Sequence, residues 1–191
     1  MRQYHDNGGV LPAQWDDLRF PASAVKQNPV TAKPDFDVWR MGDGGEAVRT
    51  YVFDGGTDEE LHFIAQLPHG FAFGTSIEAH IHWPPSAAPV AGETVIWYLE
   101  YALAEIGGVF PAPVRLAAAT HTFSASDARY QHILTELGSI DTSGWDSLSG
   151  MISCRLFRDA DTDTFAGEVA YLEADFHYHL DQVGSREEYV K

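Results

Sequence analysis

Alternation of apolar and polar residues is the feature that most limits what this chain can fold into. In segment 94–103, Val95 and every second residue after it to Leu103 are apolar or aromatic, and polar residues such as Thr94 and Glu100 fall between them. Segment 170–180 repeats the pattern, with acidic residues and histidines between the apolar ones. Successive side chains of a β-strand point to opposite faces, so this period of two predicts strands with one buried face and one face in water.

Further segments rich in β-branched and aromatic residues are expected to form strands. The expected strands are 47–53, 61–67, 77–83, 94–103, 151–157 and 169–180. Turn-forming residues separate them, including the Gly- and Pro-containing segments 54–56, 68–70, 84–86 and 107–108. The helix candidates are limited to 127–137 and the short segment 16–19. Many strands with few helices indicate an all-β fold, an antiparallel jelly-roll-like β-sandwich.

The first part of the chain differs from the rest. With 191 residues, one domain is expected. Four prolines at positions 12, 21, 29 and 34 prevent a long helix in residues 1–35 and favour extended backbone. We therefore expect residues 1–35 to form an extended N-terminal arm and residues 36–191 to form a single β-sandwich domain. The arm's apolar residues, Trp15, Leu18, Phe20 and Val25, need cover from their own domain or from a neighbouring subunit. A frayed terminus is the alternative.

Charge excludes one class of partner. The formal net charge is −16, and no Lys or Arg lies between Tyr51 and Val114. Such a surface repels a phosphate backbone, so we expect no nucleic acid as partner. No apolar stretch has the length of a signal peptide core or a membrane span, so we expect no membrane insertion. We expect the chain to be made and assembled in the cytoplasm. The single cysteine, Cys154, lies in an apolar run and is expected to be buried and inert.

Two histidine pairs are the candidate metal ligands. His80 and His82 are two residues apart in one expected strand, as are His177 and His179 in another, so each pair can present two imidazoles on one side. The spacing from Gly74 to the first pair matches the start of the cupin metal-binding motif, but the glutamate expected after the second histidine is absent. We expect the two pairs to lie on neighbouring strands or a shared surface, with no bound transition metal and no cofactor.

Other chemistry is weakly indicated. The aspartate-rich segment 159–163 begins like a calcium-binding EF-hand loop, but Thr164 stands where glycine is required and Ala170 where glutamate is required. We interpret it as a solvated turn. No serine-nucleophile elbow, phosphate-binding glycine loop or zinc-protease motif is present, so no catalytic residue is nominated and we expect no enzymatic activity.

A series of motifs resembles proteins encoded in the virion structural regions of tailed bacteriophages and prophages. The matching motifs, in chain order, are WDDLRFP at 15–21, QLPHG at 66–70, GT at 74–75, HIHW at 80–83, WYLEY at 97–101, HIL at 132–134, LFRD at 156–159, DFHYH at 175–179 and GSREEYVK at 184–191. The resemblance spans most of the chain and implies a component of the virion. It carries over no catalytic residues.

The leading hypothesis is a non-catalytic structural component of a phage or phage-like particle, such as a spike, head fibre, decoration protein or adaptor. Its expected partners are itself, in a homo-oligomer with a trimer as first guess, and other virion proteins, which we expect to attach through residues 1–50. Two alternatives are a β-sandwich module that binds a carbohydrate or a host surface glycan, and a cupin-like metal-binding enzyme that uses His80, His82, His177 and His179.

Overall fold

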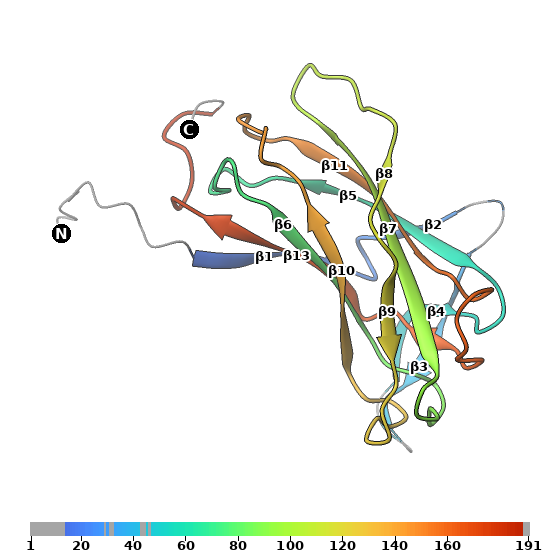
Figure 1. Ribbon diagram of the computed structural model, residues 1–191. Helices are drawn as coiled ribbons and strands as arrows, with labels where there is room; N and C mark the ends of the chain where they lie inside the picture. Colours follow the sequence, from blue (N-terminus) through green and yellow to red (C-terminus); the bar gives the residue numbers. More distant parts are fainter. Residues whose placement is uncertain (1–13, 29, 31–32, 43–44, 46, 189–191) are drawn as a thin grey trace, which may run out of the picture.

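The computed structural model describes residues 14–28, 30, 33–42, 45 and 47–188, and these residues form an antiparallel β-sandwich (Figure 1). The first sheet has the strand order β1-β13-β6-β10, with bounds Gln14–Pro21, Glu173–Leu180, Ile77–Trp83 and Ile133–Ile140. The second has the order β2-β5-β11-β7-β8, with bounds Lys26–Gln27, Glu59–Gln66, Met151–Arg158, Thr94–Ala104 and Val114–Arg115, and β9 (Ala119–Thr122) also pairs with β7. A small third sheet joins β12 (Val169–Ala170), β4 (Ala47–Phe53) and β3 (Asp35–Arg40).

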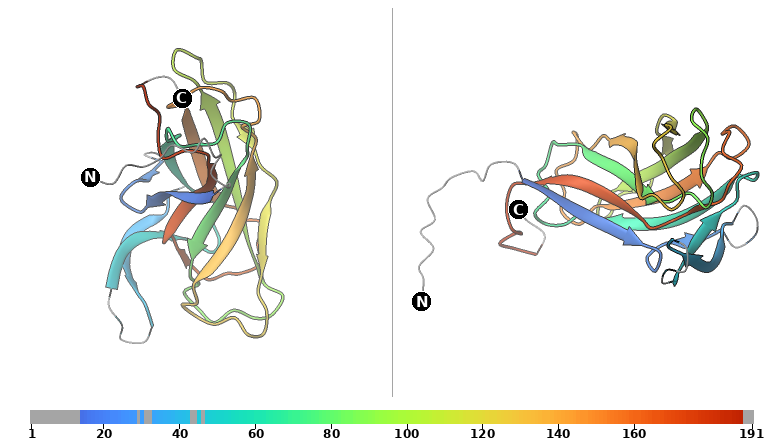
Figure 2. Two further views of the ribbon diagram at one scale, coloured as in Figure 1. Left: turned by 90° about the vertical axis from the view of Figure 1, so that its left-hand side faces the viewer. Right: turned by 90° about the horizontal axis from the view of Figure 1, so that it is seen from below.

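The topology is that of a jelly roll. Eight of the described strands make up most of the two main layers. Their order is β1-β13-β6-β10 in one layer and β5-β11-β7-β9 in the other. Chain connections therefore pass repeatedly from one layer to the other, as two Greek keys do. The expected all-β, jelly-roll-like sandwich is confirmed. Figure 2 shows the two layers packed face to face, with the β3–β4 hairpin projecting from one end.

Aromatic side chains from both layers fill the space between them. Phe20 of β1 and Phe176 of β13 pack on Phe63 of the opposite layer, with ring centroids 4.5 and 5.9 Å from that of Phe63. Trp83 and Trp97 also face each other across the sandwich at 6.1 Å. Cys154 is buried within the same core, as expected. Burial of these large rings supplies the main hydrophobic stabilisation of the fold.

Two expected helices are strands instead. Segment 16–19 lies within β1, and the second half of segment 127–137 lies within β10. Tyr130 has a φ of 64°, which a right-handed helix does not allow, and residues 133–137 alternate between buried and exposed. The strand period therefore prevails over helix propensity here. Gly138, with a φ of 113°, permits the bulge at which β10 shifts register against β6. Among the described residues no helix is long or apolar enough to cross a membrane.

The N-terminal segment belongs partly to the sandwich. Residues 14–21 and 26–27 are extended, as predicted, with a turn at 22–24 between them, but β1 pairs with β13 along its whole length and β2 pairs with β5. Phe20 and Val25 lie in the common core. A boundary at residue 35 would therefore remove two strands and two core residues from the sandwich, and the expectation that this segment docks outside the body does not hold for residues 14–27. Residues 1–13 lie outside the described residues.

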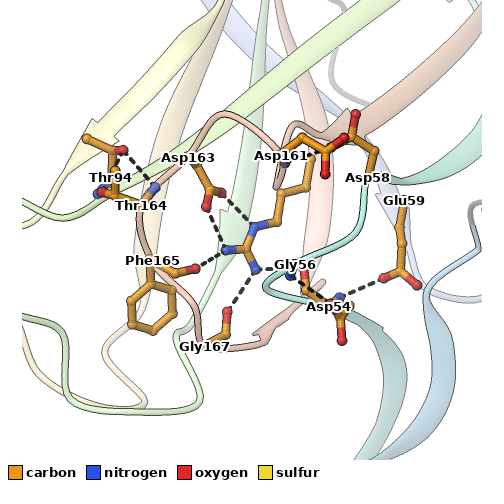
Figure 3. Close-up of polar contacts among 11 residues, drawn as sticks. Asp54, Gly56, Asp58, Glu59, Thr94, Asp161, Asp163, Thr164, Phe165 and Gly167 are labelled. Atoms are coloured by element: carbon orange, nitrogen blue, oxygen red, sulfur yellow. Dashed lines mark hydrogen bonds and ion pairs between the residues drawn. The ribbon is translucent and has the colours of Figure 1, made fainter.

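Arg158, at the end of β11, is fully buried and holds one end of the sandwich together (Figure 3). Its Nε and Nη2 donate to the two carboxylate oxygens of Asp163 at 2.8 and 3.2 Å. Its Nη1 donates to the carbonyl oxygens of Asp54 and Gly167, and Nη2 also donates to that of Phe165. All five N–H donors of the guanidinium are thereby used. The aspartate-rich segment, expected to be a solvated turn, thus supplies one buried ion-pair partner.

We predict that replacing Arg158 with methionine lowers the free energy of unfolding by about 3–5 kcal/mol, because it leaves the Asp163 carboxylate buried without a partner. Urea unfolding followed by tryptophan fluorescence measures the change. In Arg158→Met/Asp163→Leu, part of the loss should be recovered. Arg19→Met, which breaks an exposed ion pair with Glu173, should cost much less, and equal losses for the two arginine variants would contradict the prediction.

We also predict that Glu59, beside this cluster, makes the stability depend on pH. Burial, with smaller contributions from neighbouring carboxylates, raises the pKa of Glu59 to about 7. The folded state then binds a proton that the unfolded state releases near pH 4.5, so this contribution to stability is present at low pH and is lost as the pH rises through about 7. Relative to Glu59→Gln, the wild-type free energy of unfolding should fall between pH 5 and pH 8. Parallel curves for the two proteins would refute this.

Candidate functional site

The outer face of the first sheet carries rows of polar side chains. Ile77, Ala79, Ile81 and Trp83 of β6 point into the core, so the alternate residues His80 and His82 point outward. The register of β6 against β13 places His80 opposite Asp175, His82 opposite Glu173 and Glu78 opposite His177. On either side of these central strands, β1 adds Arg19 opposite Asp175 and Asp17 opposite His177, and β10 adds Glu136 opposite His80.

His80, Asp175 and His177 form the centre of this face, and we call these three residues the histidine–aspartate cluster. Each offers one nitrogen or oxygen atom that lies within 4.8 Å of the other two. His177 Nε2 is 2.9 Å from Asp175 Oδ2, and the rings of His80 and His177 are 4.2 Å apart. Although the cluster lies on an outer sheet face, His80 and Asp175 are only 8% and 4% exposed, because the neighbouring side chains cover them.

Burial and charge set the protonation of the cluster. Burial, reinforced by His177, lowers the pKa of His80, which favours a neutral imidazole with a free nitrogen lone pair. Burial alone would raise the pKa of Asp175, but its contact with His82 and the charges of His82, His177 and His80 outweigh burial, and the pKa is lowered. The cluster therefore presents a carboxylate beside a neutral imidazole, which is a donor set for a cation.

Five further side chains lie around the cluster. His82 Nε2 lies 3.5 Å from Asp175 Oδ1, and interaction with this carboxylate raises the pKa of His82. On its other side, His82 Nδ1 is 2.7 Å from His132 Nε2. Asp17 Oδ1 lies 3.2 Å from His177 Nε2, and Arg19 is engaged by Glu173 through two hydrogen bonds of 2.7 Å. The surroundings of the cluster are thus fixed by contacts from β1, β6 and β13.

Three of the four candidate histidines lie around one carboxylate. The two pairs do lie on neighbouring strands, as predicted, and His80, His82 and His177 gather around Asp175. His179 lies apart from them, with its ring 3.8 Å from that of Trp15. Asp175, which sequence reasoning placed only on the same face, supplies the central carboxylate. The ligand set also faces outward, so a cupin-like metal site inside the sandwich is not formed by these residues.

The candidate arm contacts divide into two groups. Phe20 and Val25 are buried by their own chain and have no surface to offer a neighbouring subunit. Leu18 is partly buried against the same core. Trp15 is 55% exposed even though one side of its ring lies on His179. Of the four residues, Trp15 has the largest exposed area for contact with another molecule.

A feature that sequence reasoning missed is the loop that connects β7 and β8. Residues 106–114 have the sequence IGGVFPAPV, which contains no charge, and the loop projects beyond the end of the sandwich (Figure 1). Its apolar side chains are exposed: Ile106, Val109, Phe110 and Val114. The uncharged run was visible in the sequence, but only the structure shows that nothing in the described chain covers it. We call residues 106–114 the apolar loop.

His69, in the QLPHG motif, joins two other parts of the chain. Its Nδ1 is 2.7 Å from Ser185 Oγ, and its Nε2 is 2.9 Å from Ser149 Oγ. Ser185 Oγ donates to the carbonyl oxygen of Glu187, so it accepts from His69, and Ser149 then donates to the imidazole. A hydroxyl that is hydrogen-bonded to the imidazole does not stabilise a protonated imidazolium as a carboxylate in that position would. We therefore assign His69 to holding the C-terminal segment 181–188 against the sandwich.

The chain matches no known protein-family profile, and no curated protein is similar to it in sequence. Among solved structures, that of infectious bursal disease virus Gx strain is similar with a TM-score of 0.42 at 10% identity. The match covers 91% of this chain and 33% of the viral chain. Dimeric latent PorU from Porphyromonas gingivalis has a TM-score of 0.40 at 7% identity, with 95% of this chain and 14% of its own covered. This chain thus spans a third or less of either molecule, and we draw nothing about function from likenesses of this size.

We predict that His69→Ala releases the C-terminal segment. Loss of two hydrogen bonds, each worth about 1 kcal/mol, should make trypsin cleavage after Arg186 about 30-fold faster. Mass spectrometry of the products over time measures the rate. His132→Ala serves as the control, because His132 contacts His82 and not the C-terminal segment. This variant should leave the cleavage rate unchanged. Equal rates for wild type and His69→Ala would refute the role.

Proposed function

We propose that this chain is a non-catalytic structural component of a phage or phage-like particle, which acts by associating with copies of itself and with other virion proteins. The apolar loop carries the proposal. Val109 is 90% exposed, and three further apolar side chains of the loop are exposed with it. Soluble proteins seldom leave such a group of residues in water unless another protein covers it. The bacteriophage motifs identified in the sequence support the same conclusion.

Open sheet edges support self-association. β1 and β10 end the first sheet, and β2 and β8 end the second, so each described sheet has strands with unpaired backbone groups. Natural proteins cover such edges, and pairing between copies is one way to do so. The exposed Trp15 on β1 adds apolar area beside one of these edges. A trimer stays our first expectation for the number of copies.

Attachment to the rest of the particle is proposed through the first 50 residues. Phe36 and Val38 on the β3 strand of the projecting hairpin are both exposed, and Arg49 lies over the Phe36 ring at 5.9 Å. Residues 1–50 as a whole are close to neutral, with six Lys or Arg against seven acidic residues, whereas residues 51–114 have no Lys or Arg. An acidic neighbour would therefore meet less repulsion here than at residues 51–114. Binding of a host glycan stays a prediction, which a glycan array can test.

We predict that Val109→Asp/Phe110→Ser weakens self-association more than tenfold, because a charge and a hydroxyl replace two apolar contacts at the interface. Light scattering after size-exclusion chromatography, over a concentration series, measures the oligomer. Val90→Asp changes an exposed apolar residue in a different turn and should leave the oligomer intact.

Two results would overturn the proposal. One is a wild-type chain that stays monomeric at the concentrations tested. The other is an oligomer that both variants leave unchanged, since the apolar loop would then have no part in assembly. Mass spectrometry of purified particles from the phage-producing host tests the location directly, and absence of the chain from those particles would refute a virion role.

A further inference from the structure

Two buried polar atoms of the histidine–aspartate cluster make no hydrogen bond with any residue that the structure describes. They are His80 Nδ1 and Asp175 Oδ1, which face each other at 3.7 Å. This distance is too long for a hydrogen bond, so a proton on the nitrogen does not satisfy both atoms. The side chains of His80 and Asp175 are only 10% and 6% exposed. Buried polar atoms are rarely left unpaired, so a further group is needed between them.

The spacing of the cluster fits a small cation. Nitrogen and oxygen ligands of zinc lie about 2.0–2.2 Å from the ion, which places the ligand atoms of a tetrahedral site about 3.4 Å apart. The distance from His80 Nδ1 to Asp175 Oδ1 is 3.7 Å, and that from His177 Nε2 to Asp175 Oδ2 is 2.9 Å. These two distances lie on either side of the ideal value. Rotation of the Asp175 carboxylate and of the His177 ring would bring both distances towards that value.

We propose that His80, Asp175 and His177 bind one divalent transition-metal ion of the zinc type, with water completing its coordination. Two imidazole nitrogens and one carboxylate oxygen form a donor set that binds such ions in preference to magnesium or calcium. The ion satisfies both unpartnered atoms at once. It also replaces the proton between His177 and Asp175.

Neighbouring residues hold these ligands in place. His82 contacts the Asp175 carboxylate. Contacts of this kind orient metal ligands and increase their affinity. Glu78 and Glu136, opposite His177 and His80 in the sheet, add negative charge around the site. The nearby cation Arg19 is paired with Glu173, which reduces its repulsion of an incoming ion.

The ion would connect the two central strands of the first sheet. His80 is in β6, whereas Asp175 and His177 are in β13, and the two strands are far apart in the sequence. Because the unfolded chain does not hold these ligands together, binding stabilises the folded state. This inference differs from the sequence-based expectation of no bound metal, since the unpartnered atoms become visible only in the structure. It does not depend on the proposed virion function.

The experiment uses the full-length, untagged chain, freed of metal with a chelator and titrated with ZnCl₂ alone. Isothermal titration calorimetry should show one zinc ion per chain, and the melting temperature should rise with zinc. Loss of an outer contact typically weakens metal affinity about 10- to 100-fold, so loss of a direct ligand in His177→Gln or Asp175→Asn should exceed that. Co²⁺ bound in place of zinc should give visible absorption bands typical of nitrogen and oxygen ligands.

His179→Gln is the matched control, because this histidine lies on the same strand and face but outside the cluster. It should bind zinc as the wild type does. His177 is partly exposed, so His177→Gln should fold even if the more deeply buried His80→Gln does not, and circular dichroism checks both. The proposal is overturned by fewer than one ion per chain, by unchanged affinity in folded His177→Gln and Asp175→Asn, or by loss of binding in His179→Gln.

Discussion

The buried guanidinium of Arg158 is the interaction on which the geometry of this sandwich most depends. A charged group can be held away from water only when its hydrogen bonds are satisfied, and here Asp163 and three backbone carbonyl groups use every donor. Those acceptors come from the turn after β4 and from the loop between β11 and β12. One side chain thereby fixes two connections at the same end of the molecule, where the small third sheet adjoins the main layers.

The filled interior decides where any chemistry can take place. Trp83, Trp97, Phe63 and Phe176 occupy the space between the layers, and the histidines of β6 and β13 are not part of this core. Strand alternation then directs the polar residues of β6 and β13 to the outer face. A cluster on such a face is normally solvated, but here long neighbouring side chains bury its centre. Burial lowers the pKa of His80, whereas the adjacent histidines lower the pKa of Asp175 against the effect of burial.

Much of the fold could be predicted from the sequence, and the errors have a common cause. The alternation in 94–103 and the turn residues between segments correctly indicated an antiparallel sandwich, because side-chain period is a local property. Residues 16–19 and 133–137 were expected to be helical since helix propensity and strand period are both present there, and pairing with β13 and β6 decided between them. The division at residue 35 failed for a related reason. Prolines show that a segment is extended but not which strand it pairs with.

The sequence by itself determined the fold class, the acidic surface, and the outward direction of His80, His82 and His177 on neighbouring strands. These properties follow from residue type and from the two-residue repeat of a strand. Only the tertiary structure decided that Asp175 lies at the centre of the cluster while His179 stacks on Trp15, because the register between β1, β13 and β6 sets those distances. It also decided that the apolar loop is exposed. Exposure depends on which parts of the chain cover a segment, and that is settled by the packing of residues distant in the sequence.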